Sequence, residues 1–559
     1  MSDSQTIADP MEIEVDVLVV GAGASGINAA VHASRGGAKV LLAAKSGLRN
    51  NITNWAKGGF SACMSKDDTP DLFLEDTLRA GEGMNRIRVC RQMCKGSHRT
   101  ASDLLDWGFA PVPDPQGGID LKHTIGHRKP RIIHCKDRTG FHLMTALLSK
   151  LKKSSISIVK DLMILDLIRD AEGVKGGYGI FWRTGRTVLI RADVCILATG
   201  GAGHAYEFTD NPISSTGDGF ALAFRSGAGL IDMEMIDFQL AIAAPSKIRG
   251  RPANTTGFFF SGAKIYNTIG ERPLKRYYPE TMEKSSRAEI NRTFGLEAEA
   301  GRTTESGGLY LDCSDVLGAV QSRIPGVCSI VAKAGLDLAS QPLEVAPAAH
   351  TFLGGILIDP EAFTSIPGLM AAGETAGGIH GANRLGGNAL TDALVFGARA
   401  GEFAAKKAKE TRSRQRITGF MPQWIREISE RKEGILPAEL RKSIQKKMSR
   451  HAFIIRGKEG LVKAKQEMED LRKDLFLHAA TGAGTREKFY NLRRHVENLN
   501  LIDTGLMVLT GAIHRNESRG VHYRKDAACR IEAYTGNFIQ YFENSRHRID
   551  FHPAECDRQ

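Results

Sequence analysis

The sequence has no apolar run of the roughly 18–20 residues that crossing a membrane requires. Its first ten residues have neither the basic segment nor the apolar core of a secretory signal. The 9 cysteines stand at irregular spacings, which predict neither a disulfide framework nor a zinc or iron–sulfur site. We therefore expect a soluble cytoplasmic protein with free thiols, no membrane span and no metal of its own.

The chain also lacks the spacing of a zinc finger and the aromatic signature of an RNA-binding module, although its formal net charge is +12. The excess of Lys and Arg is densest from about Lys406 to Lys465. This region predicts a solvated helical face, or a docking surface for a partner subunit, rather than a nucleic-acid site. At 559 residues the chain is long enough for two or three domains.

The 60 glycines gather in short clusters, and the first cluster follows a predicted strand, Val15–Val20. Gly21, Gly23 and Gly26 have the spacing Gly-x-Gly-x-x-Gly, and a helix is predicted to follow. Glycines at this spacing allow a tight turn, a close approach of backbone N–H groups to a pyrophosphate, and close packing of the helix on the strand. The motif therefore predicts a bound dinucleotide at the helix N-terminus.

The identity of that dinucleotide is not given by the motif. An acidic residue usually ends the second strand and binds the adenosine ribose, but here the strand Lys39–Ala44 continues into Lys45 and Ser46. These residues alone leave NAD, FAD and a degenerate site open. Further along, the stretch Ile236–Ala349 has no alternation of strands and helices, so we interpret it as an inserted domain, and after about Ala405 the sequence is charged and helical in pattern.

Several motifs in order along the chain resemble those of the flavoprotein family of fumarate reductase, succinate dehydrogenase and L-aspartate oxidase, whose members commonly lack the strand-end acid. The resemblance extends from about Val15 to Asp526. It is carried by Gly21–Gly26, Trp55–Gly59, Asp137–Gly140, Ala198–Gly201, Thr216–Gly219, Gly373-Glu374, His380–Leu390 and Asn516–Gly520. It implies an α/β fold with a Rossmann-like FAD-binding domain (1–235 and 351–410), an inserted α+β capping domain (236–350), and a C-terminal helical domain with a tail (411–559).

The resemblance implies FAD as cofactor, with its pyrophosphate at the first glycines and its ring near the segment 53–59. The implied contacts are Gly21, Gly23, Ala24, Ser25, Gly26, Lys45, Ser46, Thr53, Asn54, Trp55, Gly58, Gly59, Ala198, Thr199, Gly200, Asp218, Gly373, Glu374, Arg384, Gly387, Asn388, Ala389 and Leu390. Succinate dehydrogenases tether FAD covalently through a His, and Ile52 stands at the matching position. We therefore expect FAD to be noncovalent.

At the substrate end, the resemblance implies a carboxylate held by His350 and Arg384, the latter through a planar fork that suits bidentate pairing. On the capping domain the family has Gln-x-His-Pro-Thr, and this chain reads Asp237-Phe238-Gln239. Gln239 can donate a hydrogen bond but carries no charge. Arg287 matches another arginine of the family's capping domain.

The proton-donating arginine of the family is expected in an Arg-Gly-Glu-Gly segment. Alignment on Tyr266 and Asn267 places Ser261 and Lys264 in that segment instead. We therefore expect either a carboxylate-bearing substrate other than plain fumarate, or Lys264 or Arg287 in the role of the arginine. The adjacent aromatics Phe258–Phe260 are compatible with the core of the capping domain or with a pocket wall.

The sequence thus predicts an FAD-dependent oxidoreductase acting on a small organic acid by hydride transfer. An L-aspartate-oxidase-like enzyme is one alternative. A flavoprotein electron-transfer subunit, docked to an iron–sulfur partner and associated with a membrane only through that partner, is the other. Since no cluster or haem motif is found in the sequence, electrons are expected to come from, or go to, something outside the chain.

Overall fold

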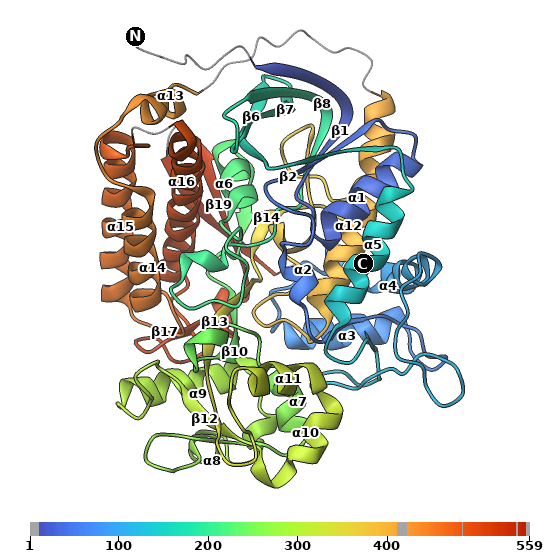
Figure 1. Cartoon of the computed structure of the whole chain (residues 1–559), viewed down its shortest axis with the longest axis vertical. Coiled ribbons are helices and arrows are strands. Elements are labelled where there is room, and N and C mark those ends of the chain that lie inside the picture. Colours follow the sequence, from blue (N-terminus) through green and yellow to red (C-terminus); the bar gives the residue numbers. More distant parts are fainter. Residues whose placement is uncertain (1–9, 411–421, 483–484, 544–545, 555–559) are drawn as a thin grey trace.

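A computed structural model describes residues 10–410, 422–482, 485–543 and 546–554, so residues 411–421 of the predicted basic region lie outside the described residues. The central sheet (Figure 1) has seven strands, six of them in the order β5-β2-β1-β8-β7-β6, with β15 paired to β8. Strands β5, β2, β1, β8 and β15 are parallel, whereas β6 and β7 extend the sheet antiparallel. The strands are β1 (Met11–Val20), β2 (Val40–Ala44), β5 (Ile156–Lys160), β6 (Leu162–Asp170), β7 (Gly173–Phe181), β8 (Thr187–Leu197) and β15 (Leu369–Ala371).

The first strand–helix–strand unit is formed as the sequence predicts. β1 starts at Met11, before the predicted boundary, and α1 (Ala24–Arg35) connects it to β2. Helix α12 (Asn388–Glu410) packs closely against α1, because a Cβ on Gly401 would lie only 2.2 Å from the carbonyl oxygen of Ala29. Helices α3 (Pro70–Ala80), α4 (Ile87–Asp106) and α5 (Thr139–Lys152) lie beside this pair in Figure 1.

The inserted segment forms a four-stranded antiparallel sheet in the order β10-β13-β12-β11, at the bottom of Figure 1. A separate apolar core, with members from Leu240 to Val345, lies inside it, within the range expected for the capping domain. Its elements are β10 (Ile236–Ile242), α7 (Thr255–Phe260), β11 (Lys264–Tyr266), α8 (Pro273–Tyr277), α9 (Arg287–Glu299), β12 (Leu309–Asp312), α10 (Leu317–Arg323), α11 (Pro325–Lys333) and β13 (Leu343–Phe352).

The C-terminal part contains the predicted helices and also strands that the sequence did not predict. The helices are α13 (Gln423–Glu430), α14 (Pro437–His451), α15 (Lys458–His478) and α16 (Thr485–His514). The strands β19 (Gly536–Glu543) and β20 (Arg546–Pro553) join β9 (Leu230–Ile231), β14 (Gly355–Leu357) and β16 (Ala376–Gly377) in a five-stranded sheet. The strands β19 and β20 are therefore joined to β9, β14 and β16 in one sheet with the FAD-binding domain.

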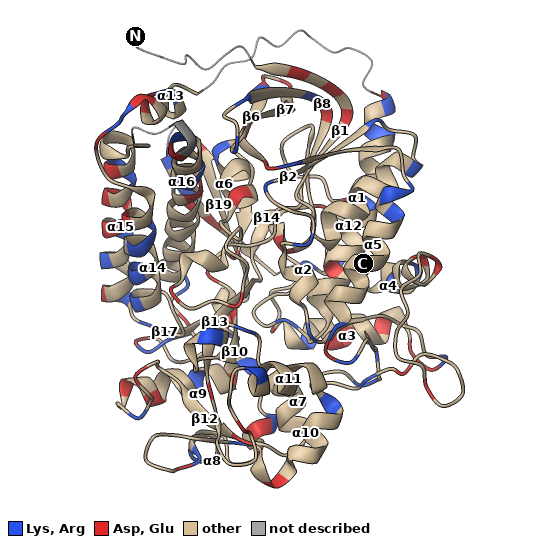
Figure 2. Ribbon diagram, viewed as in Figure 1, with Lys and Arg blue, Asp and Glu red and all other residues tan. Residues whose placement is uncertain are grey.

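Charges of both signs lie along α15 (Figure 2), whereas the charged residues of α14 are Glu439 near its start and otherwise basic residues. Lys447 Nζ of α14 lies 2.9 Å from Glu467 Oε2 of α15. Among the described residues, no helix combines the length and the apolar character needed to cross a membrane.

Candidate functional site

A large cavity of about 380 Å³ lies where the carboxyl ends of β1, β2 and β8 face the capping domain. It falls in the range of roughly 300–1,000 Å³ that is typical of small-molecule sites. Its lining joins Gly21 and Ala198, which follow two of these strands, to Arg287 and Phe260 of the capping domain. The cavity therefore spans the predicted cofactor site and the predicted substrate site.

The glycine turn is built as its spacing predicts. Gly21 has φ +113°, and a Cβ there would lie 2.1 Å from the carbonyl oxygen of Ala198. Gly23 caps the N-terminus of α1, which has no acidic residue in its first turn. The positive end of the helix is thus left open to a phosphate.

Most of the predicted cofactor contacts line this cavity. They are Gly21, Gly23, Ala24, Ser25, Lys45, Ser46, Thr53, Trp55, Gly58, Gly59, Ala198, Thr199, Gly200, Asp218, Glu374, Arg384, Gly387, Ala389 and Leu390. No atom lies within 4 Å of the position that a Cβ would take on Gly58 or Gly200, so a planar group has room to approach the backbone there. The residues present therefore fit FAD.

Four predicted cofactor contacts, Gly26, Asn54, Gly373 and Asn388, do not line the cavity but pack or hydrogen-bond to neighbouring residues. A Cβ on Gly26 would lie 1.9 Å from the carbonyl oxygen of Gly21, so this glycine serves helix packing. Gly373 packs against Ser25, and the backbone N–H of Asn54 donates to Asn51 Oδ1 at 3.0 Å. Asn388 is buried and donates through Nδ2 to Thr77 Oγ1 at 3.1 Å.

Lys45 stands where dinucleotide-binding proteins often have an acid, and its charge is compensated by its neighbours. Its Nζ lies 2.7 Å from Asp218 Oδ2 and 3.2 Å from Glu497 Oε1, and it donates to Thr216 Oγ1 at 2.7 Å. Asp218 and Lys45 both line the cavity. A Lys–Asp pair thus stands after the end of β2 in place of a single carboxylate.

Glu374 is the other carboxylate of the lining. Burial raises its pKa to about 7, although its Oε1 accepts a hydrogen bond from the backbone N–H of Phe352 at 3.0 Å. Ile52, at the position where a covalent tether would be expected, also lines the cavity.

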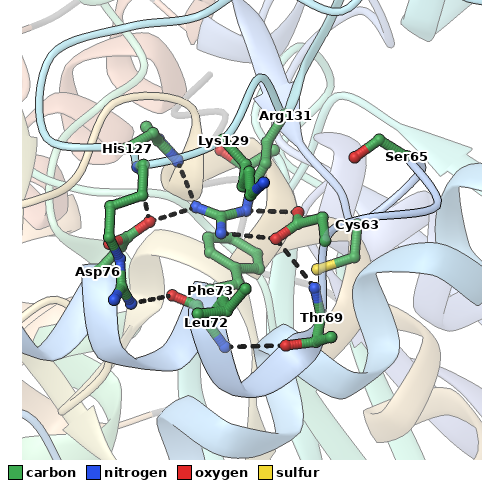
Figure 3. A network of polar contacts seen from close by, with 12 residues as sticks. Cys63, Ser65, Thr69, Leu72, Phe73, Asp76, His127, Lys129 and Arg131 are labelled. Atoms are coloured by element: carbon green, nitrogen blue, oxygen red, sulfur yellow. Dashed lines mark hydrogen bonds and ion pairs between the residues drawn. The ribbon is translucent and has the colours of Figure 1, made fainter.

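A buried ionic network holds the loop before α12 in place (Figure 3). Arg131 contacts Asp68 Oδ2 at 2.6 Å and Asp76 Oδ2 at 2.5 Å, and all three side chains are 0% exposed. Its Nη1 also lies 3.2 Å from His127 Nδ1, and His127 Nε2 lies 2.8 Å from the carbonyl oxygen of Gly386 in the cavity wall. Because a guanidinium only donates, His127 accepts at Nδ1 and donates at Nε2. Burial lowers the pKa of His127 to about 4, which keeps this neutral form.

We expect the change Arg131→Met to lower the free energy of unfolding by about 3 kcal/mol or more, because two buried carboxylates lose their cation. FAD affinity should fall as well, since the Gly386 loop loses its support. Lys129→Met is the matched control, because Lys129 pairs at 2.5 Å with an Asp67 side chain that is 67% exposed. Thermal unfolding and FAD titration of both variants test this, and equal effects of the two changes would contradict it.

At the substrate end, a β-bulge presents His350 to the cavity. β10 pairs with β13 so that Asp237 faces Thr351 and Phe238 faces Ala349, which leaves His350 as the extra residue. His350 Nδ1 lies 2.9 Å from Oδ2 of buried Asp210. A carboxylate on one ring nitrogen fixes the orientation of the imidazole and leaves the other nitrogen for a ligand.

Two arginines meet beside this histidine. Arg287 is the first residue of α9, which begins with a capping box formed by Ser286 and Glu289. Arg287 Nη1 contacts Asp237 Oδ2, and Arg384 Nη2 lies 3.0 Å from the same oxygen. Burial alone would raise the pKa of Asp237, but the two guanidinium groups outweigh it and lower that pKa.

Of the predicted catalytic residues, His350, Arg384, Arg287 and Gln239 line the cavity, whereas Ser261 and Lys264 do not. The Ser261 hydroxyl donates to the carbonyl oxygen of Gly257 at 2.9 Å, behind the end of α7. Lys264 Nζ is 3.6 Å from Asp315 Oδ2, and its side chain is 43% exposed.

Of the three adjacent aromatics Phe258–Phe260, two lie in or against the core of the capping domain and one lines the cavity. Phe258 is fully buried in the core of the capping domain, and Phe259 packs against that core. Phe260 lines the cavity. The guanidinium of Arg323 lies 5.9 Å from the centre of the Phe260 ring and lines the same wall.

Four further cations line the cavity, three from the N-terminal part of the chain and one from the capping domain. Lys57, Lys122, Lys136 and Arg323 belong to its lining. Burial lowers the pKa of Lys57 and of Lys122, and neighbouring cations contribute. Lys136 and Arg323 are exposed. These four cations attract anions toward the cavity.

Sequence reasoning missed Asp210 and the role of Asp237. Asp210 lies in no motif. The sequence around Asp237 does not indicate that it pairs with Arg287 and Arg384, which are 50 and 147 residues away. The residues of the C-terminal motif Asn516–Gly520 do not line the cavity. Within the motif, Arg519 Nε and Glu517 Oε1 form a buried ion pair at 2.8 Å.

Comparisons with known proteins identify the family of the chain. A family model described as "FAD binding domain" matches residues 16–390, and one described as "Fumarate reductase flavoprotein C-term" matches residues 441–557. A fumarate reductase (CoM/CoB) subunit from Methanothermobacter marburgensis is 35% identical, covering 92% of this chain and 94% of the relative. An L-aspartate oxidase from Streptomyces coelicolor is 31% identical, covering 93% and 90%. E. coli quinol fumarate reductase superposes with a TM-score of 0.90 at 26% identity, covering 98% of each chain.

Proposed function

The chain belongs to the family of FAD-dependent oxidoreductases that includes fumarate reductase and L-aspartate oxidase, and on that premise we propose that it transfers a hydride between noncovalent FAD and a carboxylate-bearing organic acid. One observation carries the proposal. Arg287, Arg384 and His350 converge on the cavity that the cofactor-binding glycines also line. Ile52 at the tether position supports noncovalent binding.

In the direction of reduction, the flavin, when bound in its reduced form, would supply the hydride and the two electrons that convert the carbon–carbon double bond to a single bond. The chain's own residues hold the acid and deliver the proton. Arg384 and His350 bind the carboxylate, with Asp210 fixing the imidazole. Arg287 donates a proton to the neighbouring carbon and regains one from solvent, to which its side chain is 30% exposed. Asp237, an ionised carboxylate in contact with it, orients the guanidinium group.

In this proposal Arg287 is the proton donor, the role that the sequence analysis expected of an arginine in the segment where Ser261 and Lys264 stand. We expect Arg287→Ala to lower kcat by about 10²–10⁴-fold, the usual contribution of a general acid. Lys264→Ala should leave kcat unchanged, because Lys264 does not line the cavity. Dye-linked steady-state reduction of a panel of enoates by the FAD-loaded protein measures both. Loss of activity in Lys264→Ala with retention in Arg287→Ala would contradict the assignment.

We further propose that electrons are exchanged with a separate partner protein that carries iron–sulfur clusters. Among the described residues, no group of three or more His, Cys, Asp or Glu side chains could hold a metal ion. One relative is named as one of the subunits of a fumarate reductase, which supports an assembly of several chains. L-aspartate belongs in the substrate panel, because an L-aspartate oxidase is among the relatives.

A further inference from the structure

Asp237 places a negative charge between the two arginines of the substrate site. Its Oδ2 accepts from both Arg287 and Arg384, and the side chains of Asp237 and Arg384 are 2% and 5% exposed. The other oxygen, Oδ1, is buried and has no hydrogen-bond donor among the described residues. Within the described part of the chain, the carboxylate therefore forms its ion pairs with these two arginines alone.

The three side chains together carry a net charge of one positive unit. A substrate with one carboxylate neutralises this group. A second carboxylate would leave an excess negative charge, which is costly away from water unless another cation pairs with it. The inner site is thus matched in charge to a monoanion.

Several other side chains that line the cavity from the capping domain are uncharged. Gln239, which lies on the same strand as Asp237, lines the cavity. Asn254, Thr256 and Phe260, at and in α7, line it too. These side chains are amides, a hydroxyl and an aromatic ring, which suit an uncharged substituent. Lys57, Lys122, Lys136 and Arg323 also line the cavity, but among the described residues no ion pair or hydrogen bond joins them to Asp237, Arg287 or Arg384. These four cations attract an anion during its approach.

We propose that Asp237 is a specificity-determining residue that makes this site select acids with a single carboxylate, whose other substituent is uncharged, over dicarboxylates. This inference depends on the proposed function, since it assumes that Arg384 and His350 bind a carboxylate. It goes further by naming the substrate class and the residue that sets it.

Fumarate and monomethyl fumarate form a matched pair of probes, because they share a carbon skeleton and differ by one negative charge. Each is titrated into oxidised, FAD-loaded protein, and binding is followed by perturbation of the flavin spectrum and by calorimetry. We expect monomethyl fumarate to bind about tenfold more tightly than fumarate, or more, a difference of about 1.4 kcal/mol. In Asp237→Asn, which keeps the shape and removes the charge, the preference should disappear or reverse. Asp237→Glu, which keeps the charge, is the control and should retain it.

Equal or tighter binding of fumarate by the unaltered protein would overturn the inference while leaving the proposed function intact. An unchanged preference in a folded Asp237→Asn variant would overturn the role of Asp237. If neither acid binds and neither reoxidises the reduced flavin, the proposed function itself fails, and the inference with it. The comparison in the unaltered protein remains decisive even if a variant does not fold.

Discussion

Replacing Arg384 with Ala is expected to lower kcat/KM for the organic acid by about 10²–10³-fold while FAD stays bound, since truncating one partner of a buried charge pair typically costs 2–5 kcal/mol. Asp237 would keep Arg287 as its counter-ion, so the variant is expected to fold. The loss should appear mainly as weaker binding of the carboxylate.

The control for this change is Arg384→Lys, which keeps the positive charge and loses the planar fork. It should be intermediate between the unaltered protein and Arg384→Ala. Substrate titration and FAD content are measured on the same preparations. Loss of FAD from Arg384→Ala, with normal substrate affinity in the loaded fraction, would instead assign Arg384 to flavin packing.

Replacing Gly21 with Ala is expected to abolish FAD binding. Its φ of +113° is a conformation that residues with a Cβ rarely adopt, and the added atom would lie 2.1 Å from the Ala198 carbonyl oxygen. The turn must open, and the backbone N–H groups then no longer point toward the pyrophosphate.

The matched control is Gly318→Ala, since no atom lies within 4 Å of a Cβ at that position of α10. It should purify with a full complement of flavin, as judged by absorbance. Circular dichroism distinguishes loss of cofactor from loss of fold. A folded Gly21→Ala variant that carries normal FAD would contradict this account of the turn.

The cofactor half of the site could be predicted from sequence because its signals are local. The spacing of Gly21, Gly23 and Gly26 specifies a turn within a few residues, and the turn is formed as predicted. The start of α9 carries a similarly local signal, because Ser286 and Glu289 have capping-box spacing and place Arg287 at the cavity.

The substrate half depends on contacts between distant segments, and these leave no local pattern. Asp210 meets His350 because Thr209 and Ala349 form a bridge, 140 residues apart in sequence. The surroundings of Ser261 likewise depend on how the chain folds. Helix α7 ends at Phe260, so the Ser261 hydroxyl turns back to the helix while Phe260 faces the cavity.

The most direct test of the central claim is a single turnover of the unaltered protein without oxygen. Its bound FAD is reduced chemically, and a single-carboxylate enoate is then added while the flavin absorbance and the saturated acid are both measured. The account predicts that the flavin is reoxidised and that saturated acid forms in an equal amount. A flavin that stays reduced with every enoate, and is reoxidised only by an added electron acceptor, would contradict it.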